Sequence, residues 1–346
     1  MTTFVILNWN RAALTITAVE NLLLREPGLY GVIIVDNGSR EDERDKLVEY
    51  AKKNGWVVIG EEIIRENDKV NLIENGQHSR ILLLANENYG YAKGNNLGLK
   101  LAKKLGYEWA VVMNNDIIIE TPVFEKLLCV VNKNKDQRIA VIGPKIVAKL
   151  GSQGPFEDYN LYLLFFLPIL FPLLWPVELI RFVRRKYVIS KHGVYYPYWI
   201  SGCYMLLNLN AMEEVGWFDE KTFLYAEELI LSSKLFRKGY KVAYTDKVYV
   251  KHLHEASTST LFNHRKRLKI MKEANLYYLK EYKKYGPIKL FLANIGMSYL
   301  NGLVAITFPI LLPVAVKFRE VISHAQRYYF GRRIRNKALS NDSGNE

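Results

Sequence analysis

Cysteine is scarce in this chain, which has only Cys129 and Cys203 among 346 residues and no Cys-x-x-Cys pair. That count and spacing exclude a disulfide framework and a zinc site built on thiolates. Both cysteines stand among apolar residues, so we expect both in the core. The sequence also lacks a basic leader and a small-residue cleavage site before its first apolar run, Thr2–Leu7. We therefore expect the folded part to face the cytosol.

The composition is that of a folded protein, with 49% hydrophobic and 24% charged residues. The length allows one large core or two domains. The net charge of +13 is compatible with nucleic acid, an anionic substrate or an anionic membrane. Two basic blocks, 265–289 and 317–337, flank an apolar block. This arrangement favours membrane lipids as partners and disfavours nucleic acid.

Strand and helix patterns alternate through the first half. Short β-branched runs at 4–7 and 32–35 enclose an amphipathic stretch at 12–24, which predicts a right-handed βαβ unit. Further apolar runs at 81–84 and 109–113 enclose a helical pattern at 95–104. The expected fold is α/β, Rossmann-like, with a mostly parallel central sheet and helices on both faces.

One strand of this sheet ends in a carboxylate. The apolar run 109–113 gives way to Asn114, Asn115 and Asp116. Ligands of open parallel sheets bind beyond the carboxyl ends of the strands, so an acid there can reach a metal-bound phosphate. Taken alone, the spacing favours a polar turn. The motifs elsewhere in the chain favour the metal.

Eight short motifs occur in an order that resembles the family 2 glycosyltransferases, from about residue 3 to 260 with an apolar interruption. They are residues 7–10, 35–39, 86–98, 113–116, 202–206, 216–220, 223–228 and 252–258. The resemblance implies a GT-A fold, a nucleotide-diphospho-sugar donor and inversion at the anomeric carbon. Asn114-Asn115-Asp116 is similar to the version in rhamnosyltransferase-like and mannosyltransferase-like members of membrane-associated archaeal or bacterial type.

The resemblance implies a divalent cation that neutralises the leaving diphosphate. Asp116 matches the principal metal ligand, and His252 matches a histidine that can complete the shell. His254 is near enough in sequence to compete with His252. The expected ion is Mn²⁺ or Mg²⁺, and an imidazole ligand suits Mn²⁺ better.

The resemblance also implies a nucleotide site. Asp36 matches an aspartate that accepts a hydrogen bond from the base, although a turn former is the alternative. Lys93 stands where a small residue is usual, so phosphate contact and a solvated lysine are both open. The candidate nucleotide-binding residues are Asn8, Asn10, Asp36, Asn88, Lys93 and Asn115.

The acceptor hydroxyl needs a general base. Glu228 matches the family's catalytic aspartate, but Glu is one methylene longer and Ile230 replaces a second acid. Glu227 therefore remains a second candidate for base or acceptor contact, and an acidic helix N-terminus is the structural alternative. Trp199 and Gly202 are expected to contact the acceptor, although an aromatic residue entering a strand is commonly core packing.

Two apolar blocks predict hydrophobic, membrane-associated helices. A single crossing by 161–183 would put residues 1–150 and 197–258 on opposite sides, and the block is too short to cross twice. We expect it to lie in the interface or to re-enter, with Arg181–Lys186 on lipid phosphates. For 290–316, a re-entrant hairpin with Asn301-Gly302 at its tip is favoured over a single span.

These expectations divide the chain into four parts: a nucleotide-sugar half at 1–150, a membrane-interface insertion at 151–190, an acceptor and catalytic half at 191–262, and a basic membrane region at 263–346. The predicted function is transfer of a sugar, first mannose from GDP-mannose, to a lipid-linked glycan on a dolichol- or polyprenyl-type carrier, at the cytosolic face of the cell membrane. A rhamnosyl or UDP-sugar transferase and a non-catalytic glycan- or lipid-binding relative are the alternatives. Residues 8–11 do not supply the Gly-rich phosphate loop of a nucleotidyltransferase.

Overall fold

The computed structural model describes residues 1–28, 30–64, 80–148, 151–170, 174, 176–178, 180–181, 184, 193–253 and 264–302. His254, Lys186 and the stretch 303–316 lie outside these residues, so the predictions made for them are not addressed. The chain forms two compact units, Met1–Met297 and Ser298–Glu346. The first unit contains the sheet and the candidate site.

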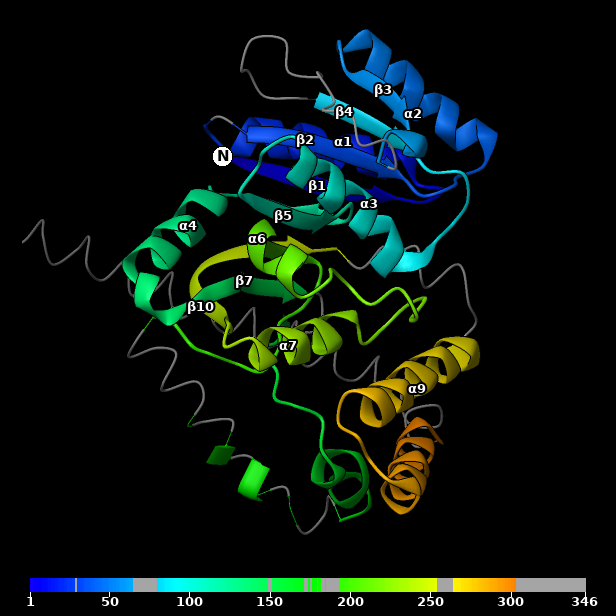
Figure 1. Ribbon diagram of the computed structural model, residues 1–346, viewed down its shortest axis with the longest axis vertical. Helices are drawn as coiled ribbons and strands as arrows, with labels where there is room; N and C mark the ends of the chain where they lie inside the picture. The colour runs from blue at the N-terminus through cyan, green and yellow to red at the C-terminus, as the bar shows by residue number, and fades with distance from the viewer. Residues whose placement is uncertain are drawn as a thin grey trace, which may run out of the picture. The chain divides into compact units, whose positions relative to one another are not determined.

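A single ten-stranded sheet organises the first unit. Nine strands follow the order β3-β4-β2-β1-β5-β9-β7-β10-β6, and β8 pairs with β7. Figure 1 shows the labelled strands in this succession from β4 down to β10. The strands are β1 (Thr2–Asn8), β2 (Tyr30–Asp36), β3 (Val57–Gly60), β4 (Arg80–Leu84), β5 (Trp109–Asn114), β6 (Ile117–Ile118), β7 (Ile139–Ala148), β8 (Gly151–Gln153), β9 (Tyr204–Asn208) and β10 (Lys241–His252).

Most of the sheet is parallel, as predicted. β3, β4, β2, β1 and β5 run parallel to their neighbours, and β10 is parallel to β7. β9 is antiparallel to both β5 and β7. The predicted βαβ unit is confirmed, with β1 and β2 connected by α1 (Ala12–Arg25).

Helices cover both faces because the central strands are apolar on both sides. Phe4 and Ile6 of β1 belong to one core, and Val5 belongs to the other. Side chains of α1, α2 (Glu41–Lys53) and α4 (Phe124–Lys133) complete the first core. Those of α3 (Gly90–Lys104), α6 (Leu209–Glu214) and α7 (Glu227–Arg237) complete the second, and Figure 1 shows these three helices in front of the sheet.

Helix α3 approaches the sheet unusually closely. A Cβ at Gly98 would lie 2.5 Å from Val5 and 2.9 Å from Val35, and one at Gly94 would lie 2.7 Å from Leu7. Because the two glycines are one helical turn apart, they lie on the face of α3 that meets β1 and β2. The glycines of the 86–98 motif therefore serve helix–sheet packing.

A third core lies beneath α7. It joins residues of the apolar insertion (Leu164), of α7 (Ile230), of α9 (His264–Glu281) and of a helix that begins at residue 287 (Ala293). A Cβ at Gly296 would lie 1.9 Å from the Leu164 carbonyl oxygen, so the backbones of the two apolar segments touch there. The inner faces of both segments are thus packed against protein.

The two cysteines differ in burial. Cys203 is buried as expected, but Cys129 is exposed, so the prediction that both lie in the core was wrong for Cys129. It stands on the solvent side of α4, whose core face is formed by Phe124, Leu127 and Val131 at helical spacing. Among the described residues, no helix combines the length and the hydropathy that a bilayer crossing requires.

Candidate active site

The polar ends of several strands converge at one edge of the sheet. In the parallel register Asn8 of β1 pairs with Asp36 of β2, and Leu7 pairs with Asn114 of β5. β10 returns to this edge, where His252 pairs with Ile117 of β6 in antiparallel register. Since Ile117 follows Asp116 directly, this pairing brings His252 beside Asp116.

Asp116 and His252, the two predicted metal ligands, are in direct contact. His252 Nε2 lies 3.0 Å from Asp116 Oδ1, and both side chains are at least nine-tenths buried. Burial lowers the pKa of His252, but its contacts with Asp116 and Cys203 outweigh burial and raise the pKa to about 10. His252 Nδ1 lies 3.2 Å from Gln153 Oε1, which orients the ring.

The pair fits a divalent cation in two respects. Asp116 Oδ1 is buried, and within the described residues no hydrogen bond of ordinary geometry satisfies it. Two neighbouring ligands of an octahedral ion, each at about 2.1 Å, lie about 3 Å apart, which is the spacing seen here. The described residues hold no cluster of three His, Cys, Asp or Glu side chains suited to a metal. A cation here would therefore take its remaining ligands from other groups, such as donor phosphates and water.

Asp36 lies at the centre of a buried polar network. Asn8 Nδ2 donates to Asp36 Oδ1 (2.9 Å), and Arg44 Nε donates to Asp36 Oδ2 (3.0 Å). The Asp36 side chain is fully buried beneath Arg44, whose own side chain is 31% exposed. A nucleotide base would reach Asp36 only if the surrounding groups moved, so its base contact stays a prediction.

The predicted residues Asn8 and Asn115 belong to the same network. Asn115 Nδ2 donates to Thr15 Oγ1 (3.0 Å), and Thr15 Oγ1 donates to Asn8 Oδ1 (2.7 Å). Asn10 adopts a left-handed backbone conformation (φ 51°) and accepts a hydrogen bond from the Arg40 amide (2.7 Å). These contacts join the ends of β1, β2 and β5, so the three asparagines hold this edge of the sheet together from within the protein.

The loop before α3 is held by a buried carboxylate. Glu61 accepts hydrogen bonds from the Asn86 side chain and the Tyr89 hydroxyl, each at 2.9 Å. The Lys93 ammonium lies 3.4 Å from the centre of the Tyr89 ring, so Lys93 makes a cation–π contact. Asn88 Oδ1 accepts from the Gly90 amide (3.0 Å) at the start of α3. Asn88 in this loop and Lys93 in the first turn of α3 therefore both have defined internal contacts.

A strained turn aims two glutamates at the site. Tyr225 and Ala226 both have left-handed backbones (φ 76° and 68°), which costs non-glycine residues about 1–3 kcal/mol each. Helix α7 begins immediately afterwards with Glu227 and Glu228. Strain retained at such a position commonly serves function, since the surrounding structure has to enforce it.

The two glutamates differ in environment. Glu228 Oε1 accepts a hydrogen bond from the Gly202 amide (2.8 Å), whereas Glu227 is only 2% exposed and its Oε1 has no partner among the described residues. Burial raises the pKa of Glu228. Burial, and then the charge of Glu228, raise the pKa of Glu227 well above its usual range. The helix dipole favours the ionised forms, but desolvation is the larger effect here.

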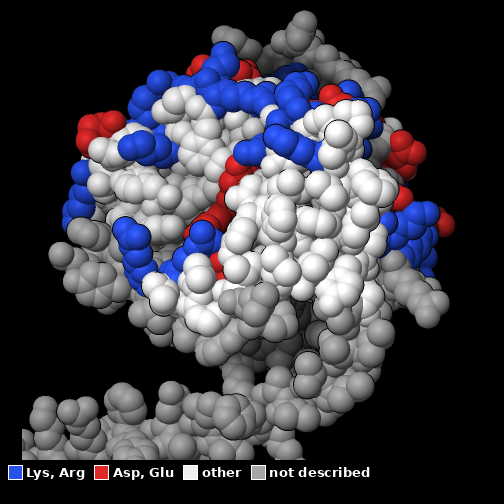
Figure 2. Space-filling view, turned by 90° about the horizontal axis from the view of Figure 1, so that it is seen from below, with Lys and Arg blue, Asp and Glu red and all other residues white. Residues whose placement is uncertain are grey.

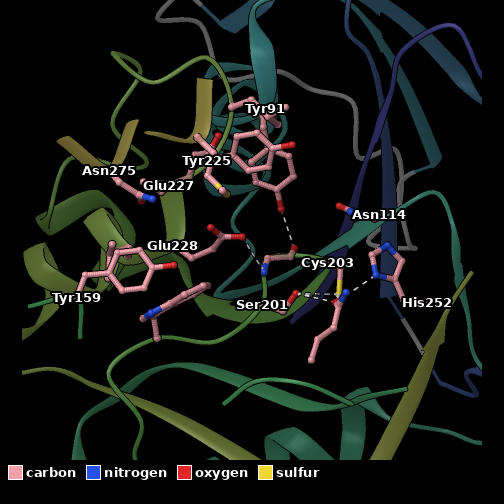
Figure 3. Close-up of a pocket in the computed structure, with 17 residues that line it drawn as sticks. Tyr91, Asn114, Tyr159, Ser201, Cys203, Tyr225, Glu227, Glu228, His252 and Asn275 are labelled. Carbon is pink, nitrogen blue, oxygen red and sulfur yellow. Dashed lines mark hydrogen bonds between the residues drawn. The ribbon is translucent and has the colours of Figure 1, made fainter. Parts of the chain in front are cut away.

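Both glutamates line a cavity of about 290 Å³. The cavity also includes His252 and Asn114 from the metal side, and Figure 3 shows Glu227 and Glu228 on the opposite side of the view from His252. Tyr91 Oη donates to the Gly202 carbonyl (2.7 Å), which fixes the segment that holds Glu228. A Cβ at Gly202 would lie 2.1 Å from Glu228 Oε1. Glycine is therefore required where Glu228 approaches the backbone.

Aromatic side chains form one wall of the cavity. Trp199 stacks on Phe156 with ring centres 4.0 Å apart, and Tyr159 meets Trp199 edge-on at 6.0 Å. The Trp199 indole N–H donates to the Glu157 carbonyl (3.0 Å). Trp199 thus both packs against protein and faces the cavity.

The structure assembles some of the predicted residues around this cavity and leaves others outside its lining. Glu227, Glu228, His252, Trp199 and Gly202 line it, and Asp116 contacts one of these residues. The predicted nucleotide residues do not line it. The lining residues that were not predicted include Tyr91, Tyr159, Met271 and Asn275. Tyr91 lies within the 86–98 motif, so the motif could have indicated it. Met271 and Asn275 share one face of α9, and their i, i+4 spacing was the only sign in the sequence that they lie together.

The chain is similar in sequence to known glycosyltransferases. Residues 3–149 match the family described as Glycosyl transferase family 2. The chain is 22% identical over 228 residues to the low-salt glycan biosynthesis hexosyltransferase Agl10 of Haloferax volcanii. That alignment covers 65% of this chain and 59% of the relative, so it spans less than two thirds of the relative's length.

Two solved structures share the fold. GalNAc-T7, solved with UDP, GalNAc and Mn²⁺, has a TM-score of 0.55 at 13% identity, covering 90% of this chain and 57% of that one. The mannosyltransferase PcManGT from Pyrobaculum calidifontis, solved with GDP-Man and Mn²⁺, has a TM-score of 0.50 at 14% identity, covering 96% and 82%. The predicted GT-A fold is confirmed. Residues 3–149 match glycosyl transferase family 2, and this match and the hexosyltransferase relative together support a glycosyltransferase of this type.

Proposed function

We propose that this protein is an inverting, divalent-cation-dependent glycosyltransferase that moves a sugar from a nucleotide diphosphate to a lipid-linked glycan. The observation that carries the proposal is the convergence on one cavity of the glutamate pair and of His252, which contacts Asp116. Such a cavity can hold an acceptor hydroxyl between a base and the anomeric carbon of a metal-bound donor.

The roles follow from the contacts. Asp116 and His252 would hold Mn²⁺ or Mg²⁺, which neutralises the leaving diphosphate when bound. Glu228 takes the proton from the acceptor hydroxyl as that oxygen attacks, because its carboxylate is held by Gly202 at the cavity wall. The aromatic wall excludes water from the attacking face. A non-catalytic binding protein would not need a buried carboxylate pair with raised pKa values in the cavity.

GDP-mannose is the first donor to test. The mannosyltransferase PcManGT shares the fold and was solved with GDP-Man, whereas GalNAc-T7 was solved with UDP. UDP-sugars and a rhamnose donor are the runners-up. If the groups around Asp36 move aside, its carboxylate can accept a hydrogen bond from the ring N–H of guanine, uracil or thymine.

A thermal-shift screen of nucleotide sugars with Mn²⁺ is expected to identify one donor that raises the melting temperature. A ligand that binds only the native state stabilises it by about 2.7 kcal/mol at a hundred times its Kd. The same nucleotide sugars without Mn²⁺ are the control and should have a smaller effect. If no nucleotide sugar shifts the melting temperature with the metal present, the donor assignment is wrong.

The apolar segments support a lipid-linked acceptor at a membrane surface. Their outer faces expose large apolar side chains, although their inner faces are packed in the third core. The exposed residues are Phe166, Ile169, Leu170, Val177 and Ile180 in the insertion, and Ile288, Phe291 and Ile295 after residue 287. Figure 2 shows a broad area without charged side chains on this side of the molecule, with Lys and Arg along its margin. An amphipathic surface of this kind lies in the bilayer interface.

Binding to vesicles that contain phosphatidylglycerol is expected to depend on these side chains. Ile288 and Phe291 are 77% and 63% exposed, so replacing both with aspartate should weaken co-sedimentation at least tenfold without unfolding the protein. Leu24→Asp is the matched control, because Leu24 is 75% exposed on α1 of the sheet domain. Equal sedimentation of both variants would contradict a membrane role for the segments.

A further inference from the structure

Helix α9 closes the glutamate end of the cavity. Two of its tyrosines, and Tyr282 directly after it, hold the helix in place. The Tyr277 and Tyr282 hydroxyls donate to Asp219 Oδ2 (2.8 and 2.5 Å), and the Tyr278 hydroxyl donates to Asp158 Oδ1 (2.6 Å). Two acidic residues far apart in sequence thus anchor one helix. Side chains that α9 presents to the cavity are consequently held in fixed positions.

Asn275 is one of these side chains. It is 7% exposed and lines the cavity, and its amide makes no hydrogen bond to the described part of the chain. The amide has two donor hydrogens and one acceptor oxygen to offer to a ligand in the cavity. In this position the amide is satisfied by a polar ligand or by water inside the cavity.

Glu227 provides a second polar group without a partner at the same end. Its Oε1 is buried and has no hydrogen bond within the described residues. Figure 3 labels Asn275 and Glu227 close together in the view, away from His252. Burial raises the pKa of Glu227, which favours the protonated carboxyl group, and that form can both donate and accept a hydrogen bond.

The remainder of the cavity selects for a flat, partly apolar ligand. Trp199 and Tyr159 form the aromatic wall, and Met271 of α9 adds an apolar contact. Pyranose rings present C–H groups on one face and hydroxyl groups at their edges, which matches an aromatic wall next to polar groups. A volume of about 290 Å³ is at the small end for ligand sites and suits one sugar ring.

We propose that Asn275 and Glu227 form a subsite that binds the hydroxyl groups of an acceptor pyranose, while Glu228 acts as the base. This inference rests on the proposed function and names its acceptor class. The acceptor sugar lies on the aromatic wall, and the subsite selects the ring and the hydroxyl that faces Glu228. Glu227 is then an acceptor-binding residue whose loss raises the KM for acceptor.

The test measures binding of methyl hexopyranosides to the full chain by saturation-transfer difference NMR, with Mg²⁺ and a nucleoside diphosphate present. The wild-type protein is expected to bind at least one methyl hexopyranoside. Asn275→Ala and Asn275→Leu should each bind it about tenfold more weakly, the loss expected for one hydrogen bond. The leucine variant keeps the volume of the side chain and so separates the amide from packing. Glu273→Gln, an exposed substitution on the same helix, should bind like wild type.

Glu227→Gln tests the subsite from α7, because it replaces the carboxyl group with an amide of the same shape. It should change acceptor affinity while leaving the thermal shift by the nucleotide sugar intact. Wild-type affinity in all the Asn275 and Glu227 variants, or no sugar binding by a wild-type protein that the nucleotide sugar still stabilises, overturns the subsite. The outcome that would contradict the proposed function is different: in that case no nucleotide sugar would stabilise the protein.

Discussion

Replacing Asp116 with alanine is expected to lower the rate of sugar transfer by about three orders of magnitude, the scale of losing an essential charge-stabilising group. Asp116 is 4% exposed and lies 3.0 Å from His252, and the described residues offer no third acidic or histidine ligand beside them. With so few protein ligands, losing one removes most of the affinity for the cation. His252→Ala should have a smaller effect, because the carboxylate remains.

Two measurements test this role for Asp116. The transfer rate is titrated with Mn²⁺, and the melting temperature is followed with the nucleotide sugar and Mn²⁺ together. Asp116→Ala should lose the metal-dependent part of both signals, whereas Asp136→Ala, at an exposed position of the same chain, should keep them. Turnover by wild-type protein that survives chelation would show that the cation is not needed.

Replacing Glu228 with glutamine is expected to lower transfer by about a hundredfold to ten-thousandfold, the usual contribution of a general base. Glutamine preserves the shape and accepts the Gly202 hydrogen bond, so donor binding should be unchanged. The thermal shift by the nucleotide sugar separates these two effects. If Glu227→Gln abolishes transfer and Glu228→Gln does not, the base is Glu227.

The pH profile provides an independent check on Glu228. A base acts in its ionised form, and burial raises the pKa of Glu228. The kcat/KM of the wild-type protein should therefore rise with pH through a range above that of an ordinary glutamate. This ascending limb should disappear in Glu228→Gln. A profile that is flat from acidic to neutral pH in the wild-type protein would contradict an ionisable base of this kind.

Gly202→Ala should give a milder version of the same defect. The added methyl group would lie 2.1 Å from Glu228 Oε1, so the carboxylate has to move. A displacement of about 1 Å can cost a hundredfold in rate. Transfer should fall while the donor-induced thermal shift stays, as in the glutamine variant.

Several site features could be predicted before the fold was known. A buried strand that ends at Asp116 and a second acidic cluster at Glu227 and Glu228 are local patterns, and strand ends of a parallel sheet necessarily meet at one edge. The alternation of strands and helices likewise depends on residue periodicity. These patterns could be recognised in the sequence because each depends on residues that are neighbours in the chain.

Other assignments depended on contacts between distant residues. The hydrogen bonds that Asp36 accepts from Arg44 and Asn8 join residues that are not neighbours in the sequence, so its burial could not be predicted. Lys93 looked like a phosphate ligand or a solvated side chain, but it lies on the Tyr89 ring. Cys129 was predicted to be buried because its sequence neighbours are apolar, yet it lies on the exposed face of α4. In each case the partner or the helical face is set by packing.

The sequence by itself determined the fold class, the carboxylate at the end of β5 and the order of the catalytic motifs. Only the tertiary structure decided that the β6–β10 pairing brings His252 to Asp116 across more than a hundred residues. It also decided that α9, predicted as part of a membrane region, supplies Asn275 to the cavity. The physical reason is that periodicity shows which face of an element is apolar, whereas the surface it meets depends on how all the elements pack together.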